Sequence, residues 1–213
     1  MTSLAILSRV DHLVYATAEL DRGSAEIEAL LGIRAVPGGR HAAWGTCNAL
    51  VGLGPRCYLE ILAPDPDHST GPAWRLFGLE TLGASRLLTW AANSTGLEKL
   101  RDSAAGEGVA LGDVLSGERQ RPDGGVLRWT LTDPRRVLAD GVVPFFIDWG
   151  QSPHPALFSP KGATLVSLQA EHPEAARVRG MLRTLDLELT VQDGPVPALL
   201  AAIDCPKGRV VLR

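Results

Sequence analysis

The stretch RVDHLVYATAELDRGSAEIEALLG, residues 9–32, decides the fold. Residues 9–17 alternate apolar and polar side chains, which is the period of a β-strand. Residues 20–31 carry Leu20, Ile27, Leu30 and Leu31 at helical spacing, and Gly32 stands where a helix commonly ends. The chain is therefore predicted to begin with a strand followed by a helix.

Turn signals divide the next residues into three further strands. Pro37-Gly38-Gly39 and Gly54-Pro55 are predicted to reverse the chain. The strands expected around them cover residues 33–36, 44–53 and 56–63. The element order of residues 8–63 is then β-α-β-β-β.

The same order of elements returns after the polar loop PDPDHSTGP, residues 64–72. A strand over 86–92 and a helix over 97–105 precede strands over 109–115, 126–132 and 143–149. Residues 164–212 repeat the order loosely, with a helix that ends near residue 185. We expect residues 1–150 to hold two modules, 8–63 and 86–149, and residues 151–213 to form a third, partial module.

Composition narrows the classes of function. The 213 residues carry 21 Lys+Arg and 24 Asp+Glu, a net charge of −3, and the basic residues are scattered, so no nucleic-acid partner is expected. No apolar run reaches the roughly 18 residues of a membrane span, and the first residues do not read as a signal peptide. Three cysteines are typical of a reducing compartment, so a cytoplasmic protein is expected. A Walker loop is missing from the sequence, so no nucleotide cofactor is predicted.

One face of the first predicted sheet gathers polar and aromatic side chains. Alternation puts the apolar residues of each strand toward the helix and leaves His12, Trp44, Thr46, Asn48, Tyr58 and Glu60 on the other side. The same rule applied to the second module leaves Arg128 and Asp148 on its open face. Such a mixture suits a ligand-binding hollow. An open sheet with one solvated face would alternate in the same way.

Four phrases in this order resemble a known family. They are PGGRH at 37–41, WGTCNAL at 44–50, YLEILAPDP at 58–66 and PFFIDWG at 144–150, and together with DHLVY at 11–15 they are similar to the glyoxalase-like domain proteins of the vicinal oxygen chelate superfamily. The resemblance implies an α+β fold in which repeated βαβββ modules form a cup-shaped, partly open β-barrel with its helices on the outside. It also implies a divalent metal, such as Zn, Mn, Fe, Ni or Co, held by the first and last strands of each module.

Carried over to this chain, the resemblance makes His12 and Glu60 metal ligands. Thr89 stands where a second histidine would be expected, and it is a poor ligand, so the metal site departs from the family pattern here. Glu60 and Asp148 are the candidate catalytic carboxylates. Arg128 could bind an anionic group of the substrate. Trp44, Asn48 and Tyr58 are further candidates for substrate binding, and so is His41 beside its glycine turn.

These residues lead to two hypotheses of different classes. The first is a metal-dependent lyase, isomerase or hydrolase that acts on a small oxygen-rich or anionic molecule in the cup. The second is a metal-free binding protein of the drug-sequestering kind, which the poor ligand at Thr89 favours. Because such cups use modules in pairs, the third module predicts a homodimer.

Overall fold

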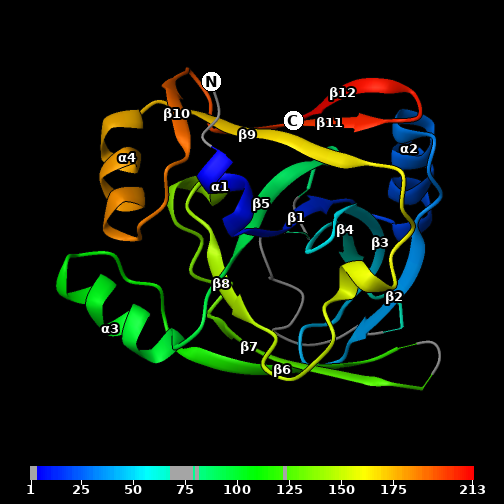
Figure 1. Ribbon diagram of the computed structural model, residues 1–213, viewed down its shortest axis with the longest axis horizontal. Coiled ribbons are helices and arrows are strands. Elements are labelled where there is room, and N and C mark those ends of the chain that lie inside the picture. The colour runs from blue at the N-terminus through cyan, green and yellow to red at the C-terminus, as the bar shows by residue number, and fades with distance from the viewer. Residues whose placement is uncertain (1–3, 68–78, 80–81, 122–123) are drawn as a thin grey trace.

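The computed structural model describes residues 4–67, 79, 82–121 and 124–213. It is a mixed α+β fold in which one large sheet curls into a nearly closed barrel and a smaller sheet lies across it (Figure 1). The helices lie on the outside of the barrel, as Figure 1 shows. This confirms the predicted fold class.

The first module forms one half of the large sheet. Its elements are β1 Val10–Ala16, α2 Leu20–Leu31, β2 Val36–His41, β3 Thr46–Gly54 and β4 Cys57–Pro64. The strands lie in the order β2-β3-β4-β1, with β1 parallel to β4. The turn predicted at Pro37-Gly38-Gly39 is wrong, because these residues lie inside β2, where a bulge interrupts pairing between Pro37 and Gly39. Glycine tolerates the backbone of such a bulge.

The second module repeats this topology. Its elements are β5 Arg86–Asn93, α3 Leu97–Gly106, β6 Val114–Gln120, β7 Val126–Thr132 and β8 Phe145–Asp148. The strand order is β5-β8-β7-β6, β5 is parallel to β8, and β5 joins the first module by pairing antiparallel with β1. The strand expected over 109–115 begins later, because Val109 and Leu111 bury their side chains from a loop.

The remaining elements form a four-stranded sheet with its own helix. They are α1 Leu4–Arg9, β9 Thr164–His172, α4 Ala175–Thr184, β10 Thr190–Asp193, β11 Ala198–Cys205 and β12 Gly208–Leu212, with short 3-10 helices at Ala139–Gly141 and Pro155–Leu157. The sheet order is β10-β9-β11-β12. Element order is thus β-α-β-β-β from β9 onward, but the pairing differs from that of the first two modules.

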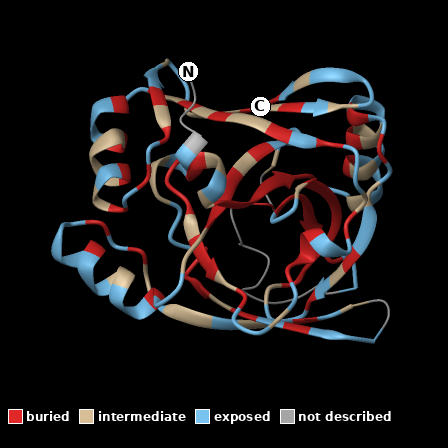
Figure 2. Cartoon of the chain, in the orientation of Figure 1, coloured by how far each residue is buried: buried red, intermediate tan, exposed pale blue. Residues whose placement is uncertain are grey.

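One apolar core joins the small sheet to the outer side of the barrel. Leu168, Ala201 and Ile203 of the small sheet are fully buried in the same cluster as Ile27 of α2 and Trp90 of β5. Burying a side chain of this size contributes roughly 1.5–3 kcal/mol. Figure 2 shows the buried residues along the barrel strands and on one side of each helix. The apolar face of the third module is therefore covered by its own chain.

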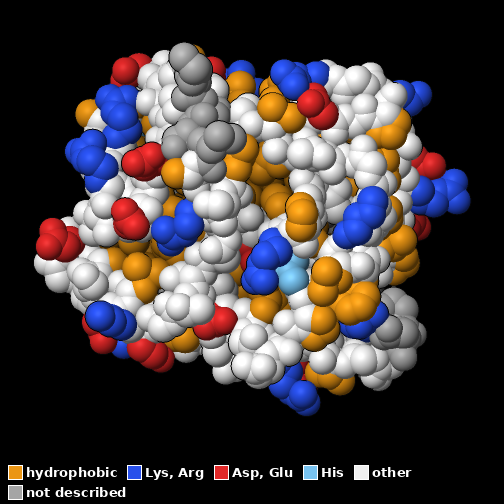
Figure 3. Space-filling model, in the orientation of Figure 1, with side chains coloured by type: hydrophobic (Ala, Val, Ile, Leu, Met, Phe, Trp, Pro, Cys, Tyr) orange, Lys and Arg blue, Asp and Glu red, His pale blue; other side chains and the backbone are white. Residues whose placement is uncertain are grey.

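Within the described ranges, every helix is too short or too polar to pass through a lipid bilayer. On the face shown in Figure 3, acidic and basic side chains are interspersed.

Candidate functional site

The inside of the barrel holds a cavity of about 550 Å³, counted to its open mouth. Its walls differ. The first module contributes His12, His41, Trp44, Asn48, Tyr58, Glu60 and Leu62, and the second contributes Arg119, Trp129, Leu131, Pro134, Phe145, Ile147 and Trp149. We call this cavity the cup. Titratable groups line one side of it, and aromatic and aliphatic groups line most of the other.

A β-bulge in β1 lets two consecutive side chains touch at the base of the cup. The pairing of β1 with β5 shifts register between Val10 and His12, so Asp11 is the extra residue. Consecutive residues of a regular strand point to opposite faces, but a bulge turns the extra residue aside. The Asp11 Oδ1 atom lies 2.8 Å from Nδ1 of His12 as a result, and both residues are buried.

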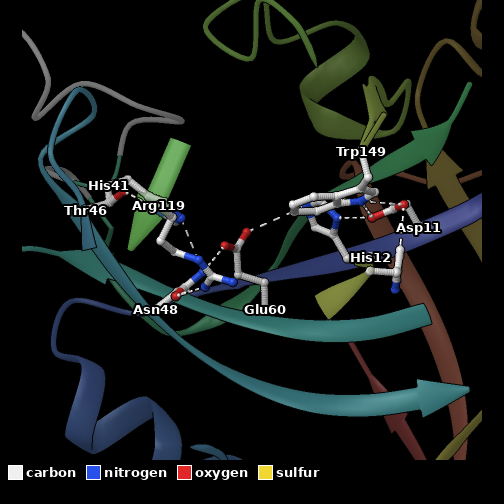
Figure 4. Close-up of polar contacts among 9 residues, drawn as sticks. Asp11, His12, His41, Thr46, Asn48, Glu60, Arg119 and Trp149 are labelled. Carbon is white, nitrogen blue, oxygen red and sulfur yellow. Dashed lines mark hydrogen bonds and ion pairs between the residues drawn. The ribbon is translucent and has the colours of Figure 1, made fainter. Parts of the chain in front are cut away.

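Ring nitrogens of His12, Trp149 and His154 converge on the Asp11 carboxylate. Figure 4 shows His12 and Trp149 beside it. Trp149 Nε1 lies 3.1 Å from Oδ2, and His154 Nε2 lies 3.1 Å from the same oxygen. Because Nδ1 of His154 accepts a hydrogen bond from the Ala156 amide, its Nε2 carries the proton that is donated to Asp11. Burial raises the pKa of Asp11, but the hydrogen bonds from His12 and His154 outweigh it and lower the pKa to about 2.

This carboxylate fixes the tautomer of His12. An ionised Asp11 only accepts hydrogen bonds, so Nδ1 of His12 donates and Nε2 keeps its lone pair when the ring is neutral. The ring stacks on Tyr58 at 4.7 Å between centroids and takes the edge of Phe145 at 5.6 Å. Nε2 lies 3.8 Å from Oε2 of Glu60. An imidazole and a carboxylate therefore face each other in the cup.

Glu60 is held from its other side by a chain of polar groups. Its Oε1 accepts a hydrogen bond from Nδ2 of Asn48, and Oδ1 of Asn48 accepts one from Nη1 of Arg119 at 2.8 Å. Figure 4 shows Glu60 between this pair and His12. His41 joins the group through Nε2, which lies 3.5 Å from Nδ2 of Asn48, and its Nδ1 lies 3.0 Å from Oγ1 of Thr46. Burial lowers the pKa of His41 to about 4, so this ring is neutral at neutral pH.

The sequence placed most of the first-module residues on the correct face. His12, Trp44, Asn48, Tyr58 and Glu60 all line the cup, and so does His41, although it lies in a strand and not beside a glycine turn. The structure brings these six residues together in one cavity, whereas Thr46 of the same predicted face is not among the residues that line it. Their roles in binding and catalysis stay predictions.

The second module has the opposite orientation to the one expected. Leu127, Trp129 and Leu131 face inward, so Arg128 points outward, where it is 71% exposed and lies 3.4 Å from Glu118. Asp148 also lies outside the cup, and its carboxylate accepts a hydrogen bond from the Gly150 amide at 2.9 Å. Neither residue can serve in the cup as predicted, because an alternating strand that turns Trp129 inward turns its neighbours outward.

The sequence prediction left out four residues that make polar contacts in the site, Asp11, Arg119, Trp149 and His154. It also left out apolar residues of β7 and β8 that line the cup, such as Trp129 and Phe145. The position of the Asp11 side chain could not be predicted, because nothing in the alternating pattern of the strand indicates a bulge. The sequence does carry a signal for His154. It lies between Pro153 and Pro155, and a histidine between two prolines lies in a restrained loop. Arg119 stands among polar residues in the sequence, so only the fold shows that it is buried in the wall of the cup.

The donors in the cup do not complete a divalent metal site. Nε2 of His12 and Oε2 of Glu60 are two donors, but Thr89 donates its hydroxyl to the Gly141 carbonyl at 3.0 Å, and the β5 residue paired with His12 is Ala91. Among the described residues, no three His, Cys, Asp or Glu side chains are grouped to hold a metal ion. Catalytic zinc takes three protein ligands. The residues present therefore do not fit a metal held by the protein.

Paired βαβββ modules around one cup define the vicinal oxygen chelate fold. The chain belongs to the Glyoxalase-like domain family, whose sequence profile matches residues 10–185. No curated protein sequence matches it.

Three solved structures are similar to this chain to different extents. A hypothetical protein from Staphylococcus aureus is 17% identical, with a TM-score of 0.66, over 95% of this chain and 83% of that one. A variant of Streptomyces coelicolor methylmalonyl-CoA epimerase, in complex with 2-nitronate-propionyl-CoA, is 21% identical over 70% of this chain and 99% of its own, with a TM-score of 0.46. The Mycobacterium tuberculosis methylmalonyl-CoA epimerase is 18% identical over 70% and 93%, with a TM-score of 0.44. At 17% identity, the similarity to the Staphylococcus aureus protein is one of fold.

Proposed function

We propose that the protein is an isomerase or lyase that moves a proton on a small organic acid bound in the cup, with His12 and Glu60 as its acid–base pair. One observation carries this proposal. Nε2 of His12 and Oε2 of Glu60 face each other at 3.8 Å, each held from behind by its own buried partners, Asp11 and Asn48. General acid–base catalysis requires two such groups on rigid supports.

The pair suits removal of a proton from a carbon next to a carbonyl. Nε2 of His12 would take the proton, the C–H electron pair would form a carbon–carbon double bond, and the π electron pair of the carbonyl would move onto its oxygen. Asp11 stabilises the imidazolium that forms, because its carboxylate already accepts the Nδ1 hydrogen bond. An isomerase returns the proton at another position, and a lyase expels a leaving group from the next carbon. The proton that is returned comes from Nε2 of the His12 imidazolium, directly or by way of the Glu60 carboxylate that faces it.

Proton exchange with solvent tests this function directly. The protein is incubated with α-ketoisocaproate in deuterated water, and loss of the C–H signal beside the carbonyl is followed by NMR. We expect exchange faster than in protein-free solution, and we expect exchange at the protein-free rate with His12→Gln. Equal rates with wild type and with His12→Gln would reject His12 as the base.

Metal content tests whether the protein holds the divalent metal that the family resemblance implies. Because the described donors stop at two, we expect protein purified without chelator to hold less than one equivalent of metal, and His12→Ala to hold the same amount. A full equivalent in wild type that His12→Ala loses would restore the metal-dependent enzyme. A site that binds organic acids and exchanges no proton would favour the metal-free binding protein.

A homodimer and a cytoplasmic location stay predictions. The small sheet buries Leu168 and Ile203 against its own chain, so its apolar face does not need a second copy to cover it. Light scattering at micromolar concentration measures the mass in solution, and a monomer would contradict the dimer.

A further inference from the structure

Arg119 is a buried guanidinium with unused hydrogen-bonding capacity in the wall of the cup. It lies in β6 and is only 4% exposed. Nη1 donates to Oδ1 of Asn48, while Nε is buried and has no hydrogen-bond partner among the described residues. Buried charged groups in folded proteins usually have hydrogen-bond partners. A bound anion would be such a partner for Arg119.

Two glycines of β2 leave space for the side chain of Arg119. The backbone of β2 passes so close that a Cβ atom added to Gly38 would lie 2.3 Å from Nη1 of Arg119 and 2.2 Å from Oδ1 of Asn48. At Gly39, with a φ of +137°, an added Cβ would lie 3.0 Å from Cγ and Cδ of Arg119. The two glycines of PGGRH thus leave space for the Arg119–Asn48 pair and fix its position.

The charge of Arg119 is only indirectly compensated. No carboxylate of the described residues forms an ion pair with it, and the carboxylate of Glu60 reaches it only through the amide of Asn48. A buried guanidinium favours an anion with which it can form hydrogen bonds. Glu60, which is connected to Arg119 through Asn48, would repel a second negative charge, so a monoanion fits better than a dianion.

The wall beside Arg119 is apolar. Trp129, Leu131, Phe145, Ile147 and Trp149 of the second module all line the cup. Sites of this kind bind a ligand through its apolar body and orient it with a few polar contacts.

We propose that Arg119 binds the carboxylate of a monoanionic organic acid whose aromatic or branched apolar body lies against the second-module wall. This inference rests on the proposed function, since it names the substrate class of the same cup. It replaces Arg128, the arginine that the sequence favoured, with one that reaches the cavity.

Calorimetric titration with matched pairs of acids and amides tests the inference. Phenylacetate and isovalerate are compared with phenylacetamide and isovaleramide, which keep the apolar body and lose the charge, and with inorganic phosphate. We expect each acid to bind the wild-type protein at least about tenfold more tightly than its amide, and phosphate to bind more weakly than either acid. Arg119→Gln should remove the difference between acid and amide. Arg128→Gln, an exposed arginine lost in the same way, should keep it.

Equal affinity of the wild type for acid and amide would overturn the inference, and so would the absence of acid binding in the millimolar range. The wild-type comparison needs no variant, so a folding defect in Arg119→Gln leaves it decisive. Failure here is separable from failure of the proposed function. Proton exchange without charge selectivity would reject the role of Arg119 alone, whereas charge-selective binding without exchange would reject the enzyme alone.

Discussion

The two halves of the cup share a topology and differ in chemistry. In the first module, the strands that pair in parallel, β1 and β4, present His12 and Glu60 to the cavity. In the second, the corresponding pair, β5 and β8, presents Ala91, Phe145 and Ile147. The repeated backbone therefore offers two equivalent sets of positions, of which only one carries reactive groups. The other set forms the apolar wall, with Arg119 as its charged residue.

This asymmetry suggests that the first module carries out the reaction and the second module selects the substrate. A reacting centre needs titratable groups whose partners are fixed, and the first module supplies them through Asp11 and Asn48. Substrate selection needs a surface that an apolar body can cover and one group that fixes its direction. If the two roles separate at the boundary between the modules, variants in the first module should slow the reaction and variants in the second should weaken binding.

The largest effect is expected at the reactive pair. His12→Gln removes the lone pair of Nε2 while keeping a side chain of similar volume, and we expect proton exchange to fall by roughly a hundredfold to ten-thousandfold. Binding of phenylacetate, which depends on the opposite wall, should change much less. Exchange rates and calorimetry on the same preparation measure both. A variant that loses acid binding as completely as exchange would contradict the separation of the two walls.

Asp11 should have the largest effect on stability. Asp11→Asn replaces an acceptor of three N–H groups by an amide that must point a donor at one of them, and a loss of about 3 kcal/mol in unfolding free energy is expected. Urea unfolding measures it. A loss below about 1 kcal/mol would mean that the three contacts contribute little.

The same residue predicts how stability depends on pH. The folded pKa of Asp11, about 2, lies below its ordinary value of 3.8, so its ionised form stabilises the folded state at and above pH 4. This contribution, roughly 2 kcal/mol, is lost as the pH falls from about 4 to 2. The difference in stability between wild type and Asp11→Asn should shrink over that interval. His41, with a pKa lowered to about 4, weakens both proteins alike between pH 6.5 and 4 and cancels in the difference. A difference that stays constant down to pH 2 would contradict the low pKa of Asp11.

The two halves also explain what the sequence could predict. Alternation located the first-module face correctly because its polar side chains, such as His12 and Asn48, contrast with the apolar ones behind them. In the second module the cup wall is itself apolar, so the rule that apolar residues face a helix turned β7 and β8 inside out. Period alone cannot tell a core face from an apolar binding wall. The bulge at Asp11 and the approach of Gly38 to Arg119 depend on contacts between distant strands, which no local pattern encodes.

A smaller effect is expected from closing the space that the glycines leave. Gly38→Ala adds one methyl group that must displace Asn48 or Arg119, because its Cβ would lie 2.2 Å and 2.3 Å from their polar atoms. We expect phenylacetate to bind about tenfold more weakly and the protein to lose about 1–3 kcal/mol of stability. Gly106→Ala, where an added Cβ meets nothing within 4 Å, is the matched control and should bind like wild type. Wild-type affinity in Gly38→Ala would show that the Arg119–Asn48 pair can move without losing the ligand.

The smallest effect is expected at Asp148 and Arg128, the charged residues that alternation assigned to the cup. Asp148→Asn keeps an oxygen that can accept the Gly150 amide, and Arg128→Gln removes only an exposed contact with Glu118, which contributes about 0–1 kcal/mol. Exchange rates and acid affinity should both stay within about twofold of wild type. These variants decide the orientation of the second module, because its strands cannot turn Asp148 and Arg128 inward without turning Trp129 and Ile147 outward. A tenfold loss in either would therefore place the apolar wall on the outside and remove the surface against which the body of the substrate is proposed to lie.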